Sequence, residues 1–331
     1  MGAYIIAEAG VNHNGRLDLA RELCLAAKNA GADCVKFQTW QTEKIITRSV
    51  AQADYQADNT GRTESQFDML KRLELSYDDF RVVKAYCDEI GIQFASTADE
   101  ADSLDFLLTL GIPFIKIGSG EIGNIPYLRY MGSKKKPVLL STGMSSLADV
   151  ELSLEALRQG GAEDITLLHC TTSYPCPYDR VNLRAMDTLR AAFGLPVGYS
   201  DHTEGIAIPT AAAARGAVVI EKHFTLDRHM EGPDHLASTE PEAFRQMVSA
   251  IRQVEAGLGS GRKTPSPEER AISEVVLKRI VAARPIPAGR LLTADDLTVK
   301  RNDRGLSARY WDLVIGTPAR RDYAADDAIE L

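Results

Sequence analysis

The stretch VGYSDHTEGIAIPTAAAARGAVVIEKHFT, residues 197–225, contains one complete unit of a pattern that recurs along this chain. It begins and ends with short apolar runs that finish in polar residues, Val197–His202 and Val218–Thr225. The alanine-rich segment between them ends at Gly216, and glycine is common directly after a helix. This order predicts a β-strand, an α-helix and a second, parallel β-strand.

The same alternation occurs eight times in roughly the first 260 residues. The eight strand-like runs are Tyr4–Gly10, Cys34–Thr39, Ile92–Thr97, Phe114–Ser119, Val138–Gly143, Ile165–Thr171, Val197–His202 and Val218–Thr225. Glycines expected just after helices are Gly31, Gly91, Gly111, Gly160 and Gly216. Eight such units predict the α/β class and a closed (β/α)₈ TIM barrel. An open, doubly wound sheet is the weaker alternative.

Two regions depart from the repeat. Gln41–Leu75 is a long polar insertion, which we expect to lie over the active face of the barrel. After the eighth helix, short strand-like runs at Ile280–Ala283 and Leu297–Lys300 are separated by turn residues, which indicates a small β-rich domain. The predicted organisation is a catalytic barrel, a linker and a C-terminal domain, at residues 1–262, 263–275 and 276–331.

Composition excludes several classes of partner. The net charge is −8, so the chain lacks the basic surface that nucleic acid or an anionic membrane would require. No apolar run approaches the roughly 20 residues of a membrane span. The five cysteines are scattered without CxxC spacing, and the amino-terminal stretch lacks a basic region, so we expect reduced thiols and a cytoplasmic location.

Polar residues gather where the predicted strands end. In a (β/α)₈ barrel these carboxyl ends form the catalytic face. The residues at these ends include Glu8, Lys36, Gln38, Thr97, Lys116, Ser119, Glu121, Ser141, His169, His202, Glu221 and His223. Because residues two apart in a strand face the same way, Lys36 and Gln38 point together, as do Glu221 and His223.

The two histidines at the last strand ends are candidate metal ligands. His202 and His223 belong to neighbouring strands, and two imidazoles leave open positions for substrate and water on one divalent ion. The alternative is that each is a hydrogen-bonded core residue. Cys170, next to His169, faces the opposite side of its strand, so we interpret it as a buried structural thiol. Trp40 either lines the site or caps the core.

Two lysines interrupt apolar strands. Lysine is almost never fully buried without a partner. Lys36 and Lys116 therefore either form salt bridges with Glu8 and Glu221 or bind an anion with phosphate and carboxylate groups, helped by neighbouring hydroxyls such as Thr97.

Several motifs together resemble one known family. They are AEAGVNHNG (7–15), VKFQT (35–39), KIGSGE (116–121), LSTGM (140–144), HCTTSYPCPY (169–178), GYSDHT (198–203), EKHFT (221–225) and GPDH (232–235). In this order they resemble the sialic acid synthase family. The last ~55 residues are similar to that family's antifreeze-like (SAF) domain, so the resemblance covers nearly the whole chain.

The resemblance implies a reaction and a role for each site residue. The family condenses phosphoenolpyruvate with an N-acylated amino sugar, and it binds Mn²⁺ or Mg²⁺, here through His202 and His223. Phosphoenolpyruvate would contact Lys36, Lys116, Ser119, Ser141 and, where many members have Asn, Thr172. The open-chain sugar would lie among Glu8, Gln38, Glu121, Tyr174 and Asp234. Arg301 would reach the partner's sugar in a domain-swapped homodimer, although Asn302–Asp303 follows it where many members have Pro-Gly.

The choice of sugar depends on finer similarities. YQADNTGRTESQFDMLKRLELS (55–76) and EKHFTLDRHMEGPDH (221–235) resemble legionaminic acid synthases more than strict N-acetylneuraminate synthases. We therefore expect 2,4-diacetamido-2,4,6-trideoxymannose as substrate, with N-acetylmannosamine as the alternative. Another phosphoenolpyruvate-using barrel, a metal hydrolase and an inactive sugar-binding scaffold are the remaining alternatives. The scaffold would not need both lysines and both histidines.

Overall fold

The computed structural model describes residues 2–48, 50 and 65–330. The chain forms two compact units, Met1–Gly259 and Ser260–Leu331. Among the described residues, no helix combines the length and the apolar character needed to span a membrane. All five cysteines are buried and free.

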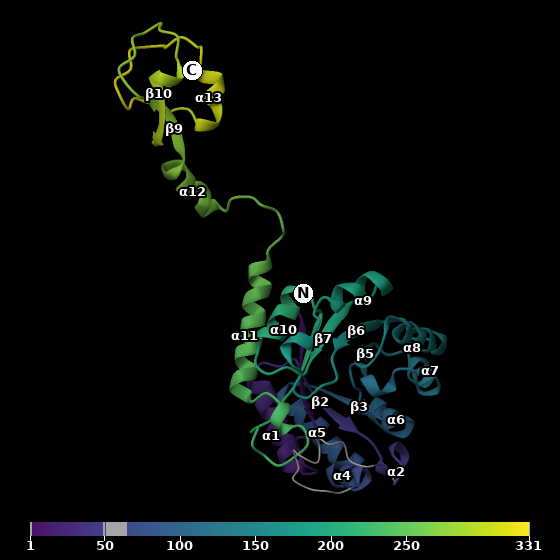
Figure 1. Cartoon of the computed structure of the whole chain (residues 1–331). Helices are drawn as coiled ribbons and strands as arrows, with labels where there is room; N and C mark the ends of the chain where they lie inside the picture. Colours follow the sequence, from purple (N-terminus) through teal and green to yellow (C-terminus); the bar gives the residue numbers. More distant parts are fainter. Residues whose placement is uncertain (1, 49, 51–64, 331) are drawn as a thin grey trace. The chain divides into compact units, whose positions relative to one another are not determined.

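The first unit is a closed barrel of eight parallel strands in sequence order (Figure 1). The strands are β1 Tyr4–Gly10, β2 Cys34–Thr39, β3 Gln93–Ala98, β4 Ile115–Ile117, β5 Val138–Ser141, β6 Ile165–Cys170, β7 Val197–Asp201 and β8 Val219–His223. Because β1 pairs with both β2 and β8, the sheet has no free edge. The predicted (β/α)₈ barrel is confirmed, and the open sheet is wrong.

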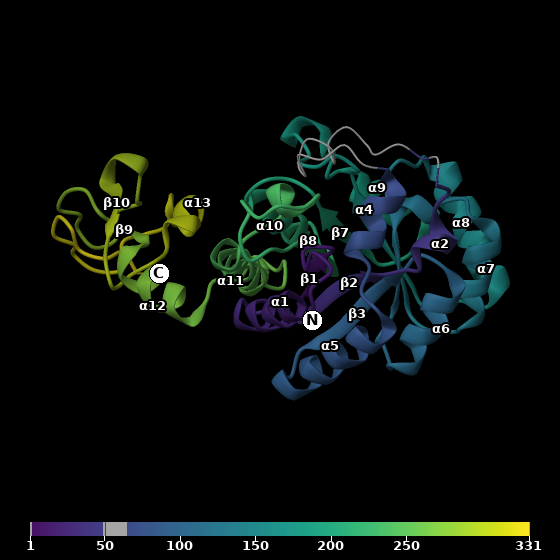
Figure 2. The same ribbon diagram turned by 90° about the horizontal axis from the view of Figure 1, so that it is seen from below.

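Helices surround these strands (Figure 2). They are α1 Leu17–Asn29, α2 Thr42–Ile45, α4 Gln66–Leu73, α5 Tyr77–Ile90, α6 Ala101–Thr109, α7 Ile125–Ser133, α8 Leu147–Gly160, α9 Ala185–Phe193, α10 Ala207–Ala214 and α11 Pro241–Leu258. Local sequence fixes several ends: α8 begins at a capping box formed by Ser146 and Asp149. The residue directly after it is Gly161, whose φ of 113° favours glycine. The expectation that Gly160 follows this helix is therefore wrong by one residue, since Gly160 is its last residue.

The insertion at 41–75 is described only at its two ends, where it forms α2 and α4. Residues 49 and 51–64 lie outside the described part of the chain. Met69 and Leu73 of α4 pack with Val11 and Trp40, which follow β1 and β2. The end of the insertion therefore packs over the carboxyl ends of these strands.

The inside of the barrel is layered. A buried apolar cluster contains one residue from each of six strands and Phe114, which directly precedes β4; its members are Ile6, Cys34, Ala95, Phe114, Leu139, Leu168 and Val219. Two positions further along the same strands come Glu8, Lys36, Thr97, Lys116, Ser141, Cys170 and Glu221. Since side chains two apart share a face, this apolar layer forms a floor beneath an inward-facing polar layer.

The remaining strand, β7, contributes Gly198 to the floor, where it pairs with Leu168. A Cβ atom there would come within 2.6 Å of the Val219 carbonyl oxygen and 2.7 Å of Leu168 Cδ2. We expect Gly198→Ala to lower the free energy of unfolding by about 1–3 kcal/mol, because a backbone oxygen cannot move away cheaply. Gly257→Ala is the control, since nothing lies within 4 Å of that Cβ. Equal midpoints of denaturant unfolding for the two variants would contradict the steric explanation.

The second unit contains helix α12, Pro267–Val276, then strands β9 Lys278–Ala282 and β10 Leu297–Arg301, which pair antiparallel, and the short helix α13 Trp311–Val314. A separate apolar core includes Ile280, Leu297 and Tyr323. The segment expected to be a linker, 263–275, thus contains most of a helix. Ser266 caps that helix and Pro267 occupies its first turn, both strong start signals.

Candidate active site

A cavity of about 200 Å³ lies at the carboxyl ends of the barrel strands, directly above the apolar floor. Twelve of the predicted site residues line this cavity: Glu8, Lys36, Gln38, Thr97, Lys116, Ser119, Ser141, Thr172, Tyr174, His202, Glu221 and His223. Closure of the barrel therefore brings together residues that are more than 200 positions apart in sequence.

Both buried lysines are paired with glutamates. Lys36 Nζ lies 2.5 Å from Glu8 Oε2 and 3.8 Å from Glu221 Oε2, and Lys116 Nζ lies 3.2 Å from Glu221 Oε1. Lys36 also donates a 3.0 Å hydrogen bond to Thr97 Oγ1. These are the salt bridges that the sequence analysis gave as one of two alternatives for the lysines. The same four charged groups also line the cavity.

The two glutamates of this network differ in proton affinity. Burial raises the pKa of Glu8, and its contact with Lys36 only partly offsets that effect. Burial also acts to raise the pKa of Glu221, but Lys116 and Lys36 outweigh it, so its pKa is lowered. Glu221 therefore remains ionised, while Glu8 can exchange a proton closer to neutral pH.

The two histidines lie together at the cavity wall, with ring centroids 5.4 Å apart. The Tyr174 ring packs against them, at centroid distances of 4.2 Å from His202 and 5.6 Å from His223. His202 Nδ1 donates a 2.7 Å hydrogen bond to the Thr171 carbonyl, an arrangement that leaves Nε2 as the lone-pair nitrogen of the neutral ring. Burial, together with the neighbouring His202, lowers the pKa of His223 well below its usual range.

His223 leaves one polar atom unsatisfied. Its Nδ1 is buried and has no hydrogen-bond partner among the described residues, and Asp234 Oδ2 lies 3.9 Å away, beyond hydrogen-bonding distance. A neutral imidazole with a buried, unsatisfied nitrogen fits a metal ligand. Within residues 2–48, 50 and 65–330, however, no group of three His, Cys, Asp or Glu side chains forms a metal site. The protein can thus offer two histidines, with the remaining positions left to water and substrate.

Hydroxyl groups form another side of the cavity. The Gly143 N–H donates a 3.0 Å hydrogen bond to Ser119 Oγ, and a Cβ on Gly143 would lie 2.3 Å from Thr172 Oγ1. Ser141 is 2% exposed, and its Oγ has no hydrogen-bond partner among the described residues. A ligand oxygen would satisfy this hydroxyl.

Three predicted residues do not line the cavity. Glu121 ends a short 3₁₀-helix, Ser119–Glu121, and accepts a hydrogen bond from Asn124 Nδ2 at 2.6 Å. Asp234 comes just before another 3₁₀-helix, and burial raises its pKa to about 6. Arg301 ends β10 in the second unit and has an exposed side chain.

Six cavity residues were not among the predicted site residues: Asp99, Gly118, Gly120, Met144, Cys170 and Ser200. Spacing could have found three of them, since Asp99 is two residues after Thr97, Cys170 two after Leu168, and Ser200 two before His202. Cys170 is buried as expected, but its thiol faces the cavity, 3.9 Å from His202 Nδ1. Its interpretation as a purely structural thiol is therefore incomplete. His169, which faces the other way, hydrogen-bonds to the Val181 carbonyl.

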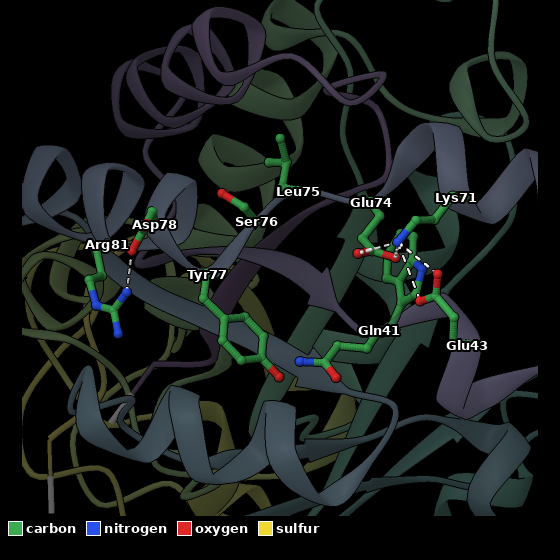
Figure 3. Close-up of a pocket in the computed structure, with 10 residues that line it drawn as sticks. Gln41, Glu43, Lys71, Glu74, Leu75, Ser76, Tyr77, Asp78 and Arg81 are labelled. Carbon is green, nitrogen blue, oxygen red and sulfur yellow. Dashed lines mark hydrogen bonds and ion pairs between the residues drawn. The ribbon is translucent and has the colours of Figure 1, made fainter.

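A second hollow, of about 540 Å³, lies beside the ends of the insertion and shares no lining residue with the first (Figure 3). Its wall includes Lys71, which forms ion pairs of 3.1 Å with both Glu43 and Glu74. Trp40 lines this hollow, and its Nε1 donates a hydrogen bond to Thr42 Oγ1. Trp40 is thus a core residue at the edge of the barrel and not part of the candidate site.

Both units of the chain match known protein families. The model of the NeuB family matches residues 23–263, and that of the SAF domain matches residues 279–330. The chain is 45% identical to the N,N'-diacetyllegionaminic acid synthase of Legionella pneumophila, over 96% of this chain and 90% of that protein. It is 39% identical to the human N-acetylneuraminate-9-phosphate synthase, over 90% of this chain and 82% of that protein.

Solved structures agree with these sequence matches. The crystal structure of N-acetylneuraminic acid synthetase from Leptospira borgpetersenii superimposes with a TM-score of 0.73 at 32% sequence identity. The similarity covers 83% of this chain and 91% of that one.

Proposed function

Because the chain belongs to the NeuB family, we propose that it condenses phosphoenolpyruvate with 2,4-diacetamido-2,4,6-trideoxymannose, giving N,N'-diacetyllegionaminate and phosphate. The relatives named above are synthases of nonulosonic acids, the nine-carbon keto sugars, and the chain is an enzyme of this type. The 45% identity to a legionaminic acid synthase supports the choice of sugar. The alternative sugar, N-acetylmannosamine, is less well supported, because the two relatives reported above that are named for N-acetylneuraminate or its 9-phosphate are 32% and 39% identical.

The observation on which the proposal depends is that one cavity contains two lysines and two histidines. Lys36 and Lys116 supply positive charge for the carboxylate and phosphate of phosphoenolpyruvate. The hydroxyls of Ser119 and Ser141 provide hydrogen bonds beside them. The His202–His223 pair and Tyr174 line the same cavity, and we propose that the sugar aldehyde binds beside them.

His202 and His223 would bind the divalent cation, which we propose to be Mn²⁺, because imidazole ligands suit transition metals better than Mg²⁺. When bound, such an ion supplies Lewis-acid polarisation of a carbonyl oxygen. Asp234 does not line the cavity, but its Oδ2 lies 3.9 Å from His223 Nδ1, and we propose that it contacts the bound sugar from there.

The carboxylates act on the phosphoenolpyruvate carbon that becomes electron-poor. When C3 of phosphoenolpyruvate forms the new bond to the sugar C1, positive charge develops at C2, and the ionised Glu221 stabilises it. Glu8, with its raised pKa, takes the proton from the water that adds at C2. The C2–O bond of the resulting tetrahedral intermediate then breaks and phosphate leaves.

One assay tests the proposal. The purified protein is incubated with phosphoenolpyruvate and Mn²⁺, with either of the two sugars, and phosphate and product mass are followed. We expect turnover with the 2,4-diacetamido sugar and loss of turnover with EDTA. Turnover with N-acetylmannosamine alone would replace the proposed substrate. No phosphate release with either sugar would contradict the proposed reaction.

We also propose a domain-swapped homodimer in which Arg301 reaches the sugar bound by the partner. Helix α12 has no buried residue. Ile272 and Val275 in this helix and Leu277 directly after it are each more than 50% exposed, so the segment presents apolar surface that a second copy can cover. Sedimentation of the whole chain tests this: we expect a dimer, and a monomer at micromolar concentration would contradict it.

A further inference from the structure

One side of the cavity contains a carboxylate outside the lysine network. Asp99 follows β3 directly and lines the cavity. Its backbone N–H donates a 3.2 Å hydrogen bond to the Thr39 carbonyl, which ties it to the end of β2. The side chain is therefore attached to the rigid barrel rim and not to a long loop.

Glu121 is the main charged neighbour of Asp99. Burial, followed by the Glu121 carboxylate, raises the pKa of Asp99 to about 7, and only Lys36 acts in the opposite direction. Tyr127 provides a second indication of this proximity. Its hydroxyl donates to the Ala98 carbonyl, and its pKa is raised by burial and then by Asp99 and Glu121. This side of the cavity thus has a negative electrostatic potential.

The positively charged side chains of the cavity already form ion pairs with carboxylates other than Asp99. Among the described lining residues, the only lysines or arginines are Lys36 and Lys116, and each is in an ion pair with Glu8 or Glu221. The buried Ser141, whose Oγ lacks a hydrogen-bond partner among the described residues, independently indicates that this cavity binds a ligand. Phosphoenolpyruvate would bind to these two lysines, so the sugar would bind on the side of the cavity that contains the Asp99 carboxylate.

We propose that Asp99 is a specificity-determining residue: its carboxylate accepts hydrogen bonds from the hydroxyl or amide N–H groups of an uncharged sugar, and together with the negative charge of the neighbouring Glu121 it disfavours a phosphorylated one. Ionised carboxylates accept hydrogen bonds only, so they match such donors. A phosphate would bring like charge to the same place. This inference rests on the proposed function. The human relative, by contrast, is named for a 9-phosphate product.

The test is a competition assay at pH 8, with the preferred sugar as substrate. The competitors are N-acetylmannosamine and N-acetylmannosamine 6-phosphate, and the measured quantity is the ratio of their inhibition constants. In the unmodified enzyme we expect the phosphate to compete at least about tenfold more weakly than the neutral sugar. In Asp99→Asn/Glu121→Gln we expect that ratio to fall about tenfold, because two nearby negative charges are removed.

Glu163→Gln is the matched control, since it also removes a negative charge but lies in the exposed turn before β6, at the opposite end of the strands. It should leave the ratio unchanged, and melting temperatures confirm that all variants fold. If the unmodified enzyme accepts the phosphorylated sugar as well as the neutral one, this inference is overturned but the proposed function is not. A double variant that keeps the original ratio would also overturn the inference. No turnover of any sugar with phosphoenolpyruvate would instead contradict the proposed function, and the inference with it.

Discussion

Replacing His223 with alanine is expected to lower kcat by at least about 10³-fold while the barrel stays folded. The side chain leaves a buried Nδ1 without a hydrogen-bond partner among the described residues, so its removal should not break a hydrogen bond of the fold. It should remove one of the two proposed metal ligands, and Lewis-acid catalysis is worth several kcal/mol, each 1.4 kcal/mol being about tenfold in rate. Steady-state phosphate release in the presence of Mn²⁺ measures the effect.

His229→Ala is the control for this variant, because His229 is exposed and does not line the cavity. Titration of Mn²⁺, followed by electron paramagnetic resonance, adds a readout independent of turnover. We expect weaker Mn²⁺ binding only in His223→Ala. Full activity, or unchanged Mn²⁺ affinity, in that variant would show that the two-histidine site is wrong.

Glu8→Gln is expected to lower kcat by about 10²- to 10⁴-fold, the usual contribution of a general base. The amide keeps the size of the side chain but cannot take the proton from water. The pH dependence has a definite sign. A base works in its deprotonated form, so kcat of the unmodified enzyme should fall as pH drops through the raised pKa of Glu8. This acid limb should be absent from the residual activity of the variant.

The variant Glu221→Gln distinguishes the role of Glu221 from that of Glu8. Because Glu221 pairs with Lys116 and lies 3.8 Å from Lys36, its loss should change the KM for phosphoenolpyruvate as well as kcat. An acid limb that persists in Glu8→Gln and disappears in Glu221→Gln would reverse the assignment of the base.

Much of the fold was determined by local sequence. Alternating apolar runs and glycines predicted eight strand–helix units, and β1 and β2 have the predicted bounds. The predicted strand bounds are wrong where a different element begins close to the end of the strand. The expected strand Phe114–Ser119 is only Ile115–Ile117, because Ser119 begins a 3₁₀-helix. The two-residue spacing of strands also determined that Lys36 with Gln38, and Glu221 with His223, face the cavity.

Tertiary structure alone decided which of these groups meet and how they titrate. Closure places β1 beside β8, so Glu8 and Glu221 share Lys36 although they are far apart in sequence. It also brings the Asp99 carboxylate close enough to Glu121 for that residue to raise its pKa. Spacing along one strand fixes the face of a side chain. Ion pairing and pKa depend instead on distances between strands and on burial, and only the closed barrel sets these.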